Sequence, residues 1–303
     1  MSPQFVDFDH DGHLDIVTAT YDGSPHISLG SAKGFAKPVH VLDDAGKRIT
    51  LQRWYDWQAK AYQQATAQAP GRLTSALAFD WDGDGDFDLL LGDKEEGFLY
   101  LRRNHGTKTA ARFDREDIPV EAGGKQLKVE GGITSPRLVD LDRDGRVDLL
   151  IGSYGDSYAA KPGGGVYWFR NVGEPGSPKF AAAVTLIEPS QKGATAPTRP
   201  DGGLYVDAGD YDGDGVIDLV VGAYSQWMPP PRTLTDKEKD ELAALRAQQK
   251  AIAAETQRAG TSITPEQRQS LNERRTKVNQ QIDALVPRAQ RTPFVWLYRG
   301  IRE

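Results

Sequence analysis

Short apolar runs recur along the chain and predict buried β-strands, because each run is bounded by turn residues. They lie at residues 14–17, 88–92, 148–152 and 218–222, and the last three end in glycine. Another strand is predicted ahead of each run, and the clearest pair is residues 2–7 (SPQFVD) and residues 135–140 (SPRLVD).

Two more strands complete the repeating unit. The third strand recurs at 97–102, 165–170 and 293–298, and the fourth at 35–42, 113–120 and 180–187. A four-stranded unit that repeats about every 60–70 residues and is rich in Gly and aromatic residues is typical of a β-propeller. We therefore predict an all-β fold, a β-propeller of four recognisable blades with the last one incomplete. The predicted blades lie near 1–45, 72–121, 133–188 and 203–225 plus 292–300.

The β pattern is interrupted between residues 233 and 288. Thr235 and Glu238 form a capping-box signal, and Thr264 precedes Pro265 as a second helix start. Apolar residues at helical spacing predict an antiparallel helical hairpin, namely Leu242, Leu245, Ile252, Leu271, Val278, Ile282 and Leu285. The predicted domains are a propeller of 1–232 plus 289–303 and an inserted hairpin of 233–288, which either decorates the propeller or docks another protein.

A shorter helical insertion is predicted at residues 51–68. It carries four aromatic residues, Trp54, Tyr55, Trp57 and Tyr62. Such residues stack on sugar rings or on a partner when they are exposed, and otherwise pack back onto the propeller.

The segment ahead of each apolar run has the pattern Asp-x-Asp-x-Asp-Gly-x-x-Asp, at residues 7–15, 80–88, 140–148 and 210–218. These positions hold 16 of the 30 aspartates, so the four matches are not a matter of composition. Like-charged pairs about 5 Å apart at an effective dielectric of about 20 repel by about 3 kcal/mol, which a hard cation would remove. Oxygen-only ligands favour Ca²⁺ over zinc, copper or magnesium.

The spacing is that of the first half of an EF-hand loop, with carboxylates at the first, third and fifth positions and a turn glycine at the sixth. A ninth-position Asp closes the loop where an EF-hand has a later Glu. We predict four Ca²⁺ sites whose carboxylate ligands are Asp7, Asp9, Asp11, Asp15, Asp80, Asp82, Asp84, Asp88, Asp140, Asp142, Asp144, Asp148, Asp210, Asp212, Asp214 and Asp218. The seventh residues would bind through backbone carbonyls: His13, Asp86, Arg146 and Val216. The alternatives are that the loops are metal-free acidic turns, or that the ions are purely structural.

Loop and flanking strands together resemble the FG-GAP/VCBS repeats of integrin-α-like propellers. The strands at 148–152 (DLLIG) and 166–171 (VYWFRN) carry this resemblance, which covers most of residues 1–225 and 292–300. The family implies calcium between the first two strands of each blade and usually an extracellular setting. It commonly has about seven blades, whereas this sequence contains four. The ring is then either small with a ragged end or part of a larger propeller, and we expect an incomplete ring or one that a partner completes.

Composition limits the remaining function classes. The chain has 303 residues, a formal charge of −6 and no cysteine, which excludes disulfides and thiolate metal sites. No basic stripe favours nucleic acid, and no apolar run is long enough to span a membrane. The pattern of a signal peptide is not found in the given residues, but calcium loops of moderate affinity fill only outside the cytosol. We therefore expect a secreted, periplasmic or cell-surface protein.

No catalytic constellation is found. Four of the five histidines lie in the first repeat (His10, His13, His26 and His40, with His105 beyond it), and none falls in a known catalytic motif. We expect a calcium-stabilised binding or scaffold module that contacts a protein partner or a second copy through the arm 233–288. The alternatives are a calcium-dependent lectin that uses Trp57 or Trp227, and a propeller-type polysaccharide lyase or hydrolase.

Overall fold

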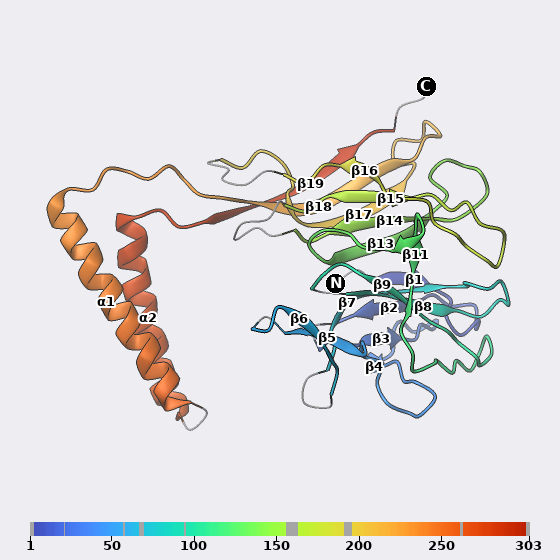
Figure 1. Cartoon of the computed structure of the whole chain (residues 1–303), viewed down its shortest axis with the longest axis horizontal. Coiled ribbons are helices and arrows are strands. Elements are labelled where there is room, and N and C mark those ends of the chain that lie inside the picture. Colours follow the sequence, from blue (N-terminus) through green and yellow to red (C-terminus); the bar gives the residue numbers. More distant parts are fainter. Residues whose placement is uncertain are drawn as a thin grey trace. The chain divides into compact units, whose positions relative to one another are not determined.

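The structure is a computed structural model, and it describes residues 3–20, 22–56, 58–66, 70–93, 95–155, 163–190, 196–260 and 263–300. Most elements are antiparallel β-strands, and two helices follow near the C-terminus (Figure 1). Two compact units are present, one of residues 1–192, 199–225 and 292–303 and one of residues 193–198 and 226–291. The domain boundaries predicted at 232 and 289 stay a prediction.

Four antiparallel sheets make up the first unit. The first contains β1 (Gln4–Val6), β2 (Asp15–Ala19), β3 (Pro25–Ser28) and β4 (Val39–His40), and the second contains β7 (Leu73–Phe79), β8 (Asp88–Asp93), β9 (Leu99–Arg102) and β10 (Ile118–Pro119). The third contains β13 (Ile133–Val139), β14 (Asp148–Ser153), β15 (Val166–Phe169) and β16 (Val184–Ile187). The fourth has three strands among the described residues, β17 (Gly202–Gly209), β18 (Asp218–Trp227) and β19 (Gln290–Tyr298). The prediction of four blades with an incomplete last one is confirmed.

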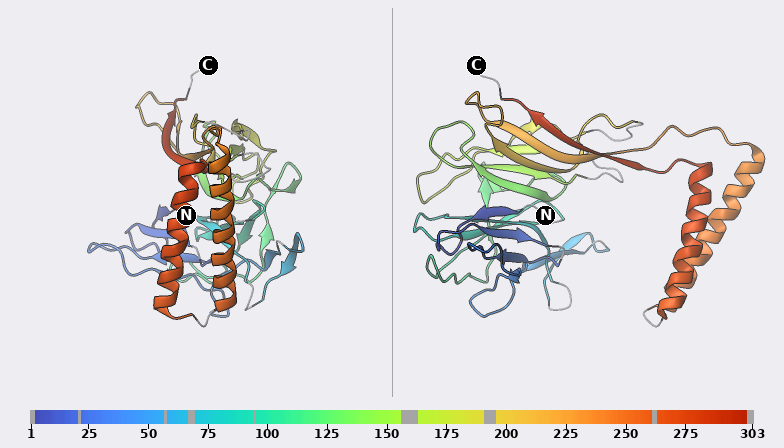
Figure 2. Two further views of the ribbon diagram at one scale, coloured as in Figure 1. Left: turned by 90° about the vertical axis from the view of Figure 1, so that its left-hand side faces the viewer. Right: turned by 180° about the vertical axis from the view of Figure 1, so that it is seen from behind.

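Successive sheets pack face to face, with β2 against β7, β7 against β13, and β13 and β14 against β17 (Figures 1 and 2). Strands β8 and β14 lie inside this stack, and their residues alternate between two neighbouring sheets. Leu89 and Leu91 pack toward the first sheet, whereas Leu90 packs toward the third. Burial on both faces explains why these strands are continuous apolar runs.

The predicted helix at 51–68 is wrong, because β5 (Arg53–Asp56) and β6 (Ala61–Gln64) form a hairpin there. Tyr55 and Tyr62 face each other across it, with ring centroids 5.3 Å apart, and the Tyr62 hydroxyl donates to Asp93 at 2.6 Å. Aromatic cross-strand pairs stabilise a hairpin, so the aromatic residues favoured strands over a helix. Trp57 lies outside the described residues. A short two-stranded ribbon, β11 (Glu121–Ala122) and β12 (Lys125–Gln126), follows β10.

The fourth strands are shorter than predicted. Residues 35–42 and 113–120 contain only the two-residue strands β4 and β10, while residues 180–187 contain the four-residue strand β16. Turns and isolated bridges occupy the rest of these segments, including a bridge from Phe113 to Asn104.

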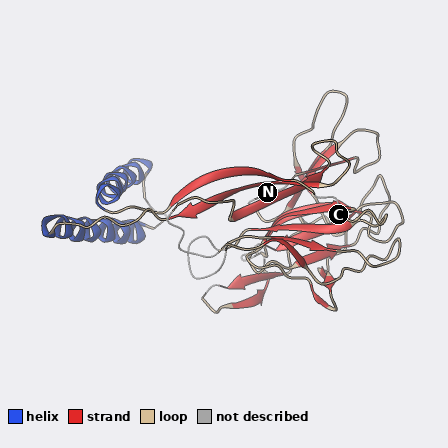
Figure 3. Cartoon of the chain, turned by 90° about the horizontal axis from the view of Figure 1, so that it is seen from above, coloured by secondary structure: helices blue, strands red, loops and turns tan. Residues whose placement is uncertain are grey.

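Two helices form an antiparallel hairpin in the second unit, drawn in blue in Figure 3. They are α1 (Asp236–Ala259) and α2 (Pro265–Leu285). The capping box predicted at Thr235 with Glu238 is present. The helix start predicted at Thr264 and Pro265 is present as well, and the structure adds a capping box between Thr264 and Gln267. The predicted apolar residues of the two helices pack together in one cluster. Neither described helix combines the length and the apolar character that a membrane span needs.

Candidate metal centres

Each Asp-rich loop joins the first strand of a sheet to the second. The loop at 7–15 follows β1, and those at 80–88, 140–148 and 210–218 follow β7, β13 and β17. All four adopt the same backbone turn. The sixth-position glycines Gly12, Gly85, Gly145 and Gly215 have φ between 84° and 89°, which glycine adopts without strain.

Backbone N–H groups organise the carboxylates of every loop. The sixth glycine donates to Oδ2 of the first Asp, at 3.1 Å for Asp7 and 2.9 Å for Asp140. The seventh residue donates to Oδ1 of the fifth Asp in the four pairs His13–Asp11, Asp86–Asp84, Arg146–Asp144 and Val216–Asp214. The predicted metal contacts of the seventh carbonyls stay a prediction.

Three carboxylates meet in each loop, with one oxygen of each within 4.8 Å of the other two. The triplets are Asp7, Asp9 and Asp15; Asp80, Asp82 and Asp84; Asp140, Asp142 and Asp148; and Asp210, Asp212 and Asp218. The remaining predicted carboxylate ligands, Asp11, Asp88, Asp144 and Asp214, lie outside these triplets.

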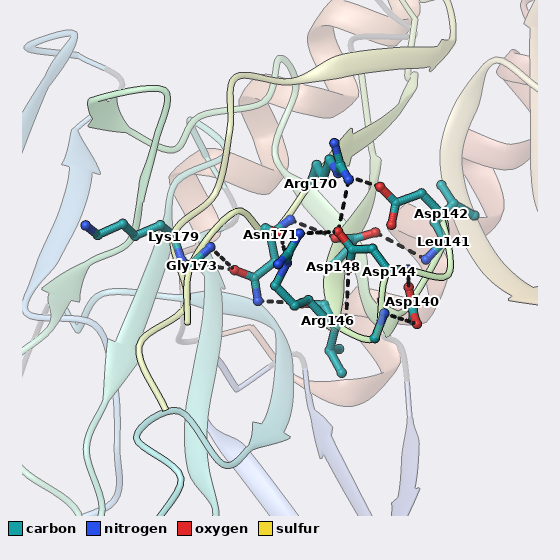
Figure 4. Close-up of polar contacts among 12 residues, drawn as sticks. Asp140, Leu141, Asp142, Asp144, Arg146, Asp148, Arg170, Asn171, Gly173 and Lys179 are labelled. Carbon is teal, nitrogen blue, oxygen red and sulfur yellow. Dashed lines mark hydrogen bonds and ion pairs between the residues drawn. The ribbon is translucent and has the colours of Figure 1, made fainter. Parts of the chain in front are cut away.

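The ninth-position aspartates are almost completely buried and hold the loop to the sheet. Asp148 accepts from the backbone N–H of Leu141 at 3.2 Å and from that of Asn171 at 2.7 Å (Figure 4). It also accepts from the Trp168 indole N–H at 2.9 Å. Each of the other three accepts one N–H from its own loop and one from beyond the third strand: Asp15 from Phe8 and Gly30, Asp88 from Trp81 and Asn104, and Asp218 from Tyr211 and Gly300. This residue therefore has a structural role besides any metal contact.

Arginine side chains form ion pairs with aspartates of three of the loops. These ion pairs were not predicted from the sequence. Arg170 contacts Asp142 and also Asp144, the latter at 3.0 Å, and Arg146 contacts Asp144 as well (Figure 4). Arg103 contacts Asp82, and Arg299 lies 3.7 Å from Asp212. At the first loop, no Lys or Arg of the described residues forms an ion pair with an aspartate.

An Arg-Asn dipeptide that recurs in the sequence could have indicated two of these arginines. Arg103-Asn104 and Arg170-Asn171 occupy the same place after the third strand of their sheets. Asn104 and Asn171 are buried, and each side-chain oxygen accepts two backbone N–H groups of the following turn. The dipeptide thus supplies an ordered turn together with a cation directed at the loop.

The first loop shows the charge imbalance that a cation would correct. Oδ1 of Asp7 is buried and has no hydrogen-bond partner among the described residues. Burial, followed by repulsion from Asp15 and Asp11, raises the pKa of Asp9. In the second loop, burial and repulsion from Asp84 raise the pKa of Asp86, and burial raises that of Asp88 to about 6.

Two arginines reverse this effect on the carboxylate pKa in the third loop. Burial opposes ionisation of Asp144, but hydrogen bonds from the Arg146 backbone and from the Arg170 and Arg146 side chains outweigh it and lower its pKa. The donor set of all four loops is carboxylate oxygen, which suits a hard divalent ion such as Ca²⁺. Acidic groups that could hold a metal ion are therefore present in every repeat.

Comparison with known proteins gives one family. The model of the FG-GAP-like repeat matches residues 7–91, 80–151 and 140–221. Integrin alpha-PS2 of Drosophila melanogaster is 29% identical over 226 residues, which cover 69% of this chain but only 15% of that relative's length. No solved structure is significantly similar to the chain.

Proposed function

Because the chain belongs to the family of FG-GAP-like repeat proteins, we propose that it is a calcium-stabilised β-propeller that binds a protein partner at or outside the cell surface. The resemblance expected from the sequence is thereby confirmed. The activity and partners of this chain remain proposals, since it matches a small part of its integrin relative. One propeller fold hosts many functions, so the argument rests on particular residues.

The buried, unpartnered Oδ1 of Asp7 carries the calcium part of the proposal. A buried polar atom without a partner costs about 1–3 kcal/mol, and it is found where an ion or water completes a site. One carboxylate oxygen of Asp7 also lies within 4.8 Å of an oxygen of Asp9 and of one of Asp15. All four loops share the same turn, so we propose four Ca²⁺ sites with the aspartate ligands predicted from the sequence.

The proposed ions are mainly structural. Each would join the loop to the buried ninth-position Asp and so to the strands on both sides. Calcium would then order the loop-bearing end of the propeller, and a partner that binds only the folded form would bind in a calcium-dependent way. Catalysis plays no part in this proposal.

Melting curves in EDTA and in calcium test the ions. Binding at a concentration about 100 times Kd adds about 2.7 kcal/mol, which is a rise of about 5–10 °C in Tm. Asp7→Asn should lose part of this rise, whereas Asp240→Asn on the exposed side of α1 should keep all of it. A wild-type protein that neither binds calcium nor changes its Tm would contradict the proposal.

The helical hairpin 233–288 is proposed as a separate domain that makes the protein contact. Its apolar residues are used within its own core, so the exposed polar faces of α1 and α2 would meet the partner. The full chain is compared with a form in which a short Gly-Ser linker replaces 233–288. Self-association, measured by sedimentation, and capture of cell-surface proteins in calcium should both decline in the deletion form. Equal behaviour of the two forms would disprove the role of the hairpin.

A further inference from the structure

A second kind of metal site lies in the first sheet, away from the Asp-rich loops. Three side chains from separate segments meet there: Asp22 from the β2–β3 turn, His26 from β3 and His40 from β4. One ligand atom of each lies within 4.8 Å of the others. We propose that these residues bind a borderline transition-metal dication, of which Zn²⁺ is the representative. This inference goes beyond the proposed calcium-dependent function.

Strand register brings the two histidines together. His26 and His40 are direct partners in the β3–β4 pair, and their ring centroids are 4.2 Å apart. Both Nε2 atoms point at one carboxylate oxygen, with Asp22 Oδ2 lying 2.7 Å from that of His40 and 3.6 Å from that of His26. Bonds of about 2.0–2.1 Å in a tetrahedral zinc site place ligand atoms about 3.3 Å apart. The two distances bracket this value, so only small side-chain shifts are needed.

Surrounding groups hold the ligands in the required orientation. The other oxygen of Asp22, Oδ1, accepts from the Thr20 hydroxyl at 2.6 Å and from the Ser24 N–H at 3.1 Å, which leaves Oδ2 directed at the histidines. His26 Nδ1 lies 3.2 Å from the Ser24 carbonyl. In the tautomer that donates this bond, Nε2 keeps its lone pair for a metal, and most histidine ligands in proteins have such a partner.

The chemistry of these three donors differs from that of the Asp-rich loops. Imidazole nitrogen suits zinc, copper or nickel, whereas calcium takes oxygen ligands. Three protein ligands with side-chain exposures of 34%, 13% and 40% leave a fourth position open to water. The site would therefore select zinc in the presence of calcium.

Arg48 is the group that competes with the metal. Its Nη1 lies 3.6 Å from Asp22 Oδ2, and its side chain is 42% exposed. A guanidinium in this place neutralises the carboxylate, and its exposure leaves it free to turn toward solvent when a dication binds. Arg48→Gln should accordingly raise zinc affinity severalfold.

Zinc titration in saturating calcium tests the proposal, because calcium occupies the Asp-rich loops. Wild-type protein should bind one equivalent of zinc by equilibrium dialysis, and its Tm should rise. His26→Gln and His40→Gln should each weaken binding by more than about tenfold, the least effect that loss of an outer-shell partner has. His105→Gln is the matched control, since His105 makes a similar pair with Asp114 at 2.9 Å but belongs to no cluster of three possible ligands among the described residues. Its zinc binding should equal that of wild type.

Histidine NMR on the wild-type protein gives a result that does not depend on how the variants fold. Zinc should shift the ring resonances of His26 and His40 and leave those of His105 unchanged. The proposal is overturned if calcium-loaded wild type binds no zinc, if zinc shifts His10 and His13 instead, or if His26→Gln and His40→Gln bind zinc as wild type does.

Discussion

The first and third Asp-rich loops share one backbone and differ in the charge around it. Both place a turn glycine at the sixth position and a fully buried Asp at the ninth. In the first loop, burial and neighbouring carboxylates raise the pKa of Asp9, whereas the hydrogen bonds of Arg146 and Arg170 lower that of Asp144 in the third. The loop geometry is therefore determined by the nine residues themselves. The need for a cation depends on whether arginine side chains already neutralise the loop carboxylates.

The largest effect is expected from removing what the two loops share. Asp148→Ala removes the acceptor of three N–H groups, that of Asn171 in a buried position and those of Leu141 and Trp168 in half-buried positions. At about 1–3 kcal/mol for each unsatisfied group, we expect a loss of roughly 3–5 kcal/mol in the free energy of unfolding.

Urea denaturation in EDTA measures this loss without any contribution from metal. Asp142→Ala, at an exposed position of the same loop, is the control and should cost less than about 1 kcal/mol. If the two variants were equally stable, the structural role assigned to the ninth Asp would be wrong.

A smaller effect is expected from removing the difference between the loops. Arg170→Gln takes away a guanidinium that contacts Asp142 and Asp144, so calcium no longer competes with it. An exposed ion pair contributes up to about 1 kcal/mol. If calcium no longer has to displace it, the calcium affinity of the third loop should rise by up to about fivefold. Calorimetric titration measures it.

Arg143→Gln is the matched control for that titration. Arg143 lies in the same loop and carries the same charge, but its side chain forms no ion pair with any of the described residues. If Arg143→Gln raised the calcium affinity as much as Arg170→Gln does, the gain would come from the change in net charge and not from the lost contact.

The smallest effect concerns pH in the metal-free protein. Asp9 has a raised pKa in the folded state, so its ionisation costs stability as pH rises above its ordinary pKa of 3.8. Asp144 has a lowered pKa, so its stabilising effect is present above 3.8 and is lost as pH falls below it. In EDTA at neutral pH, Asp9→Asn should raise Tm and Asp144→Asn should lower it, each by about 1 °C.

Both differences should vanish in strong acid, where the wild-type carboxyls are protonated as well. Thermal melts of the two variants and of wild type from neutral to acidic pH measure these differences in Tm. Shifts of the same sign for the two variants would contradict the contrast between the loops.

Much of the fold was predictable because local pattern dictates it. The central residues of strands such as β8 and β14 are apolar since both faces are buried, and the starts of the two helices at Thr235 and Thr264 have recognisable signals in the sequence. The hairpin of β5 and β6 was missed because the pairing of Tyr55 with Tyr62 depends on the partner strand. The short β4 and β10 likewise depend on edge contacts that no single segment encodes.

The candidate metal sites were also predictable only in part. The Asp-rich loops are contiguous, so spacing alone predicted the carboxylates that the structure brings together. Arg170 contacts Asp142 from the segment that follows β15, and His26 meets His40 only through strand register. Contacts between segments require the fold to be known first.

The bond between Asp218 and the Gly300 N–H also bears on the order in which the blades assemble. The equivalent bonds of the first three sheets join residues 15, 16 and 23 positions apart, whereas this one joins residues 82 apart. Closing an 82-residue loop instead of a 16-residue one costs only about 1.5 kcal/mol more in chain entropy. It nevertheless makes the contact non-local, and non-local contacts form slowly. We expect the first three sheets to form early in folding, and β19 to join β18 last, after the helical hairpin has brought the two ends of its insertion together.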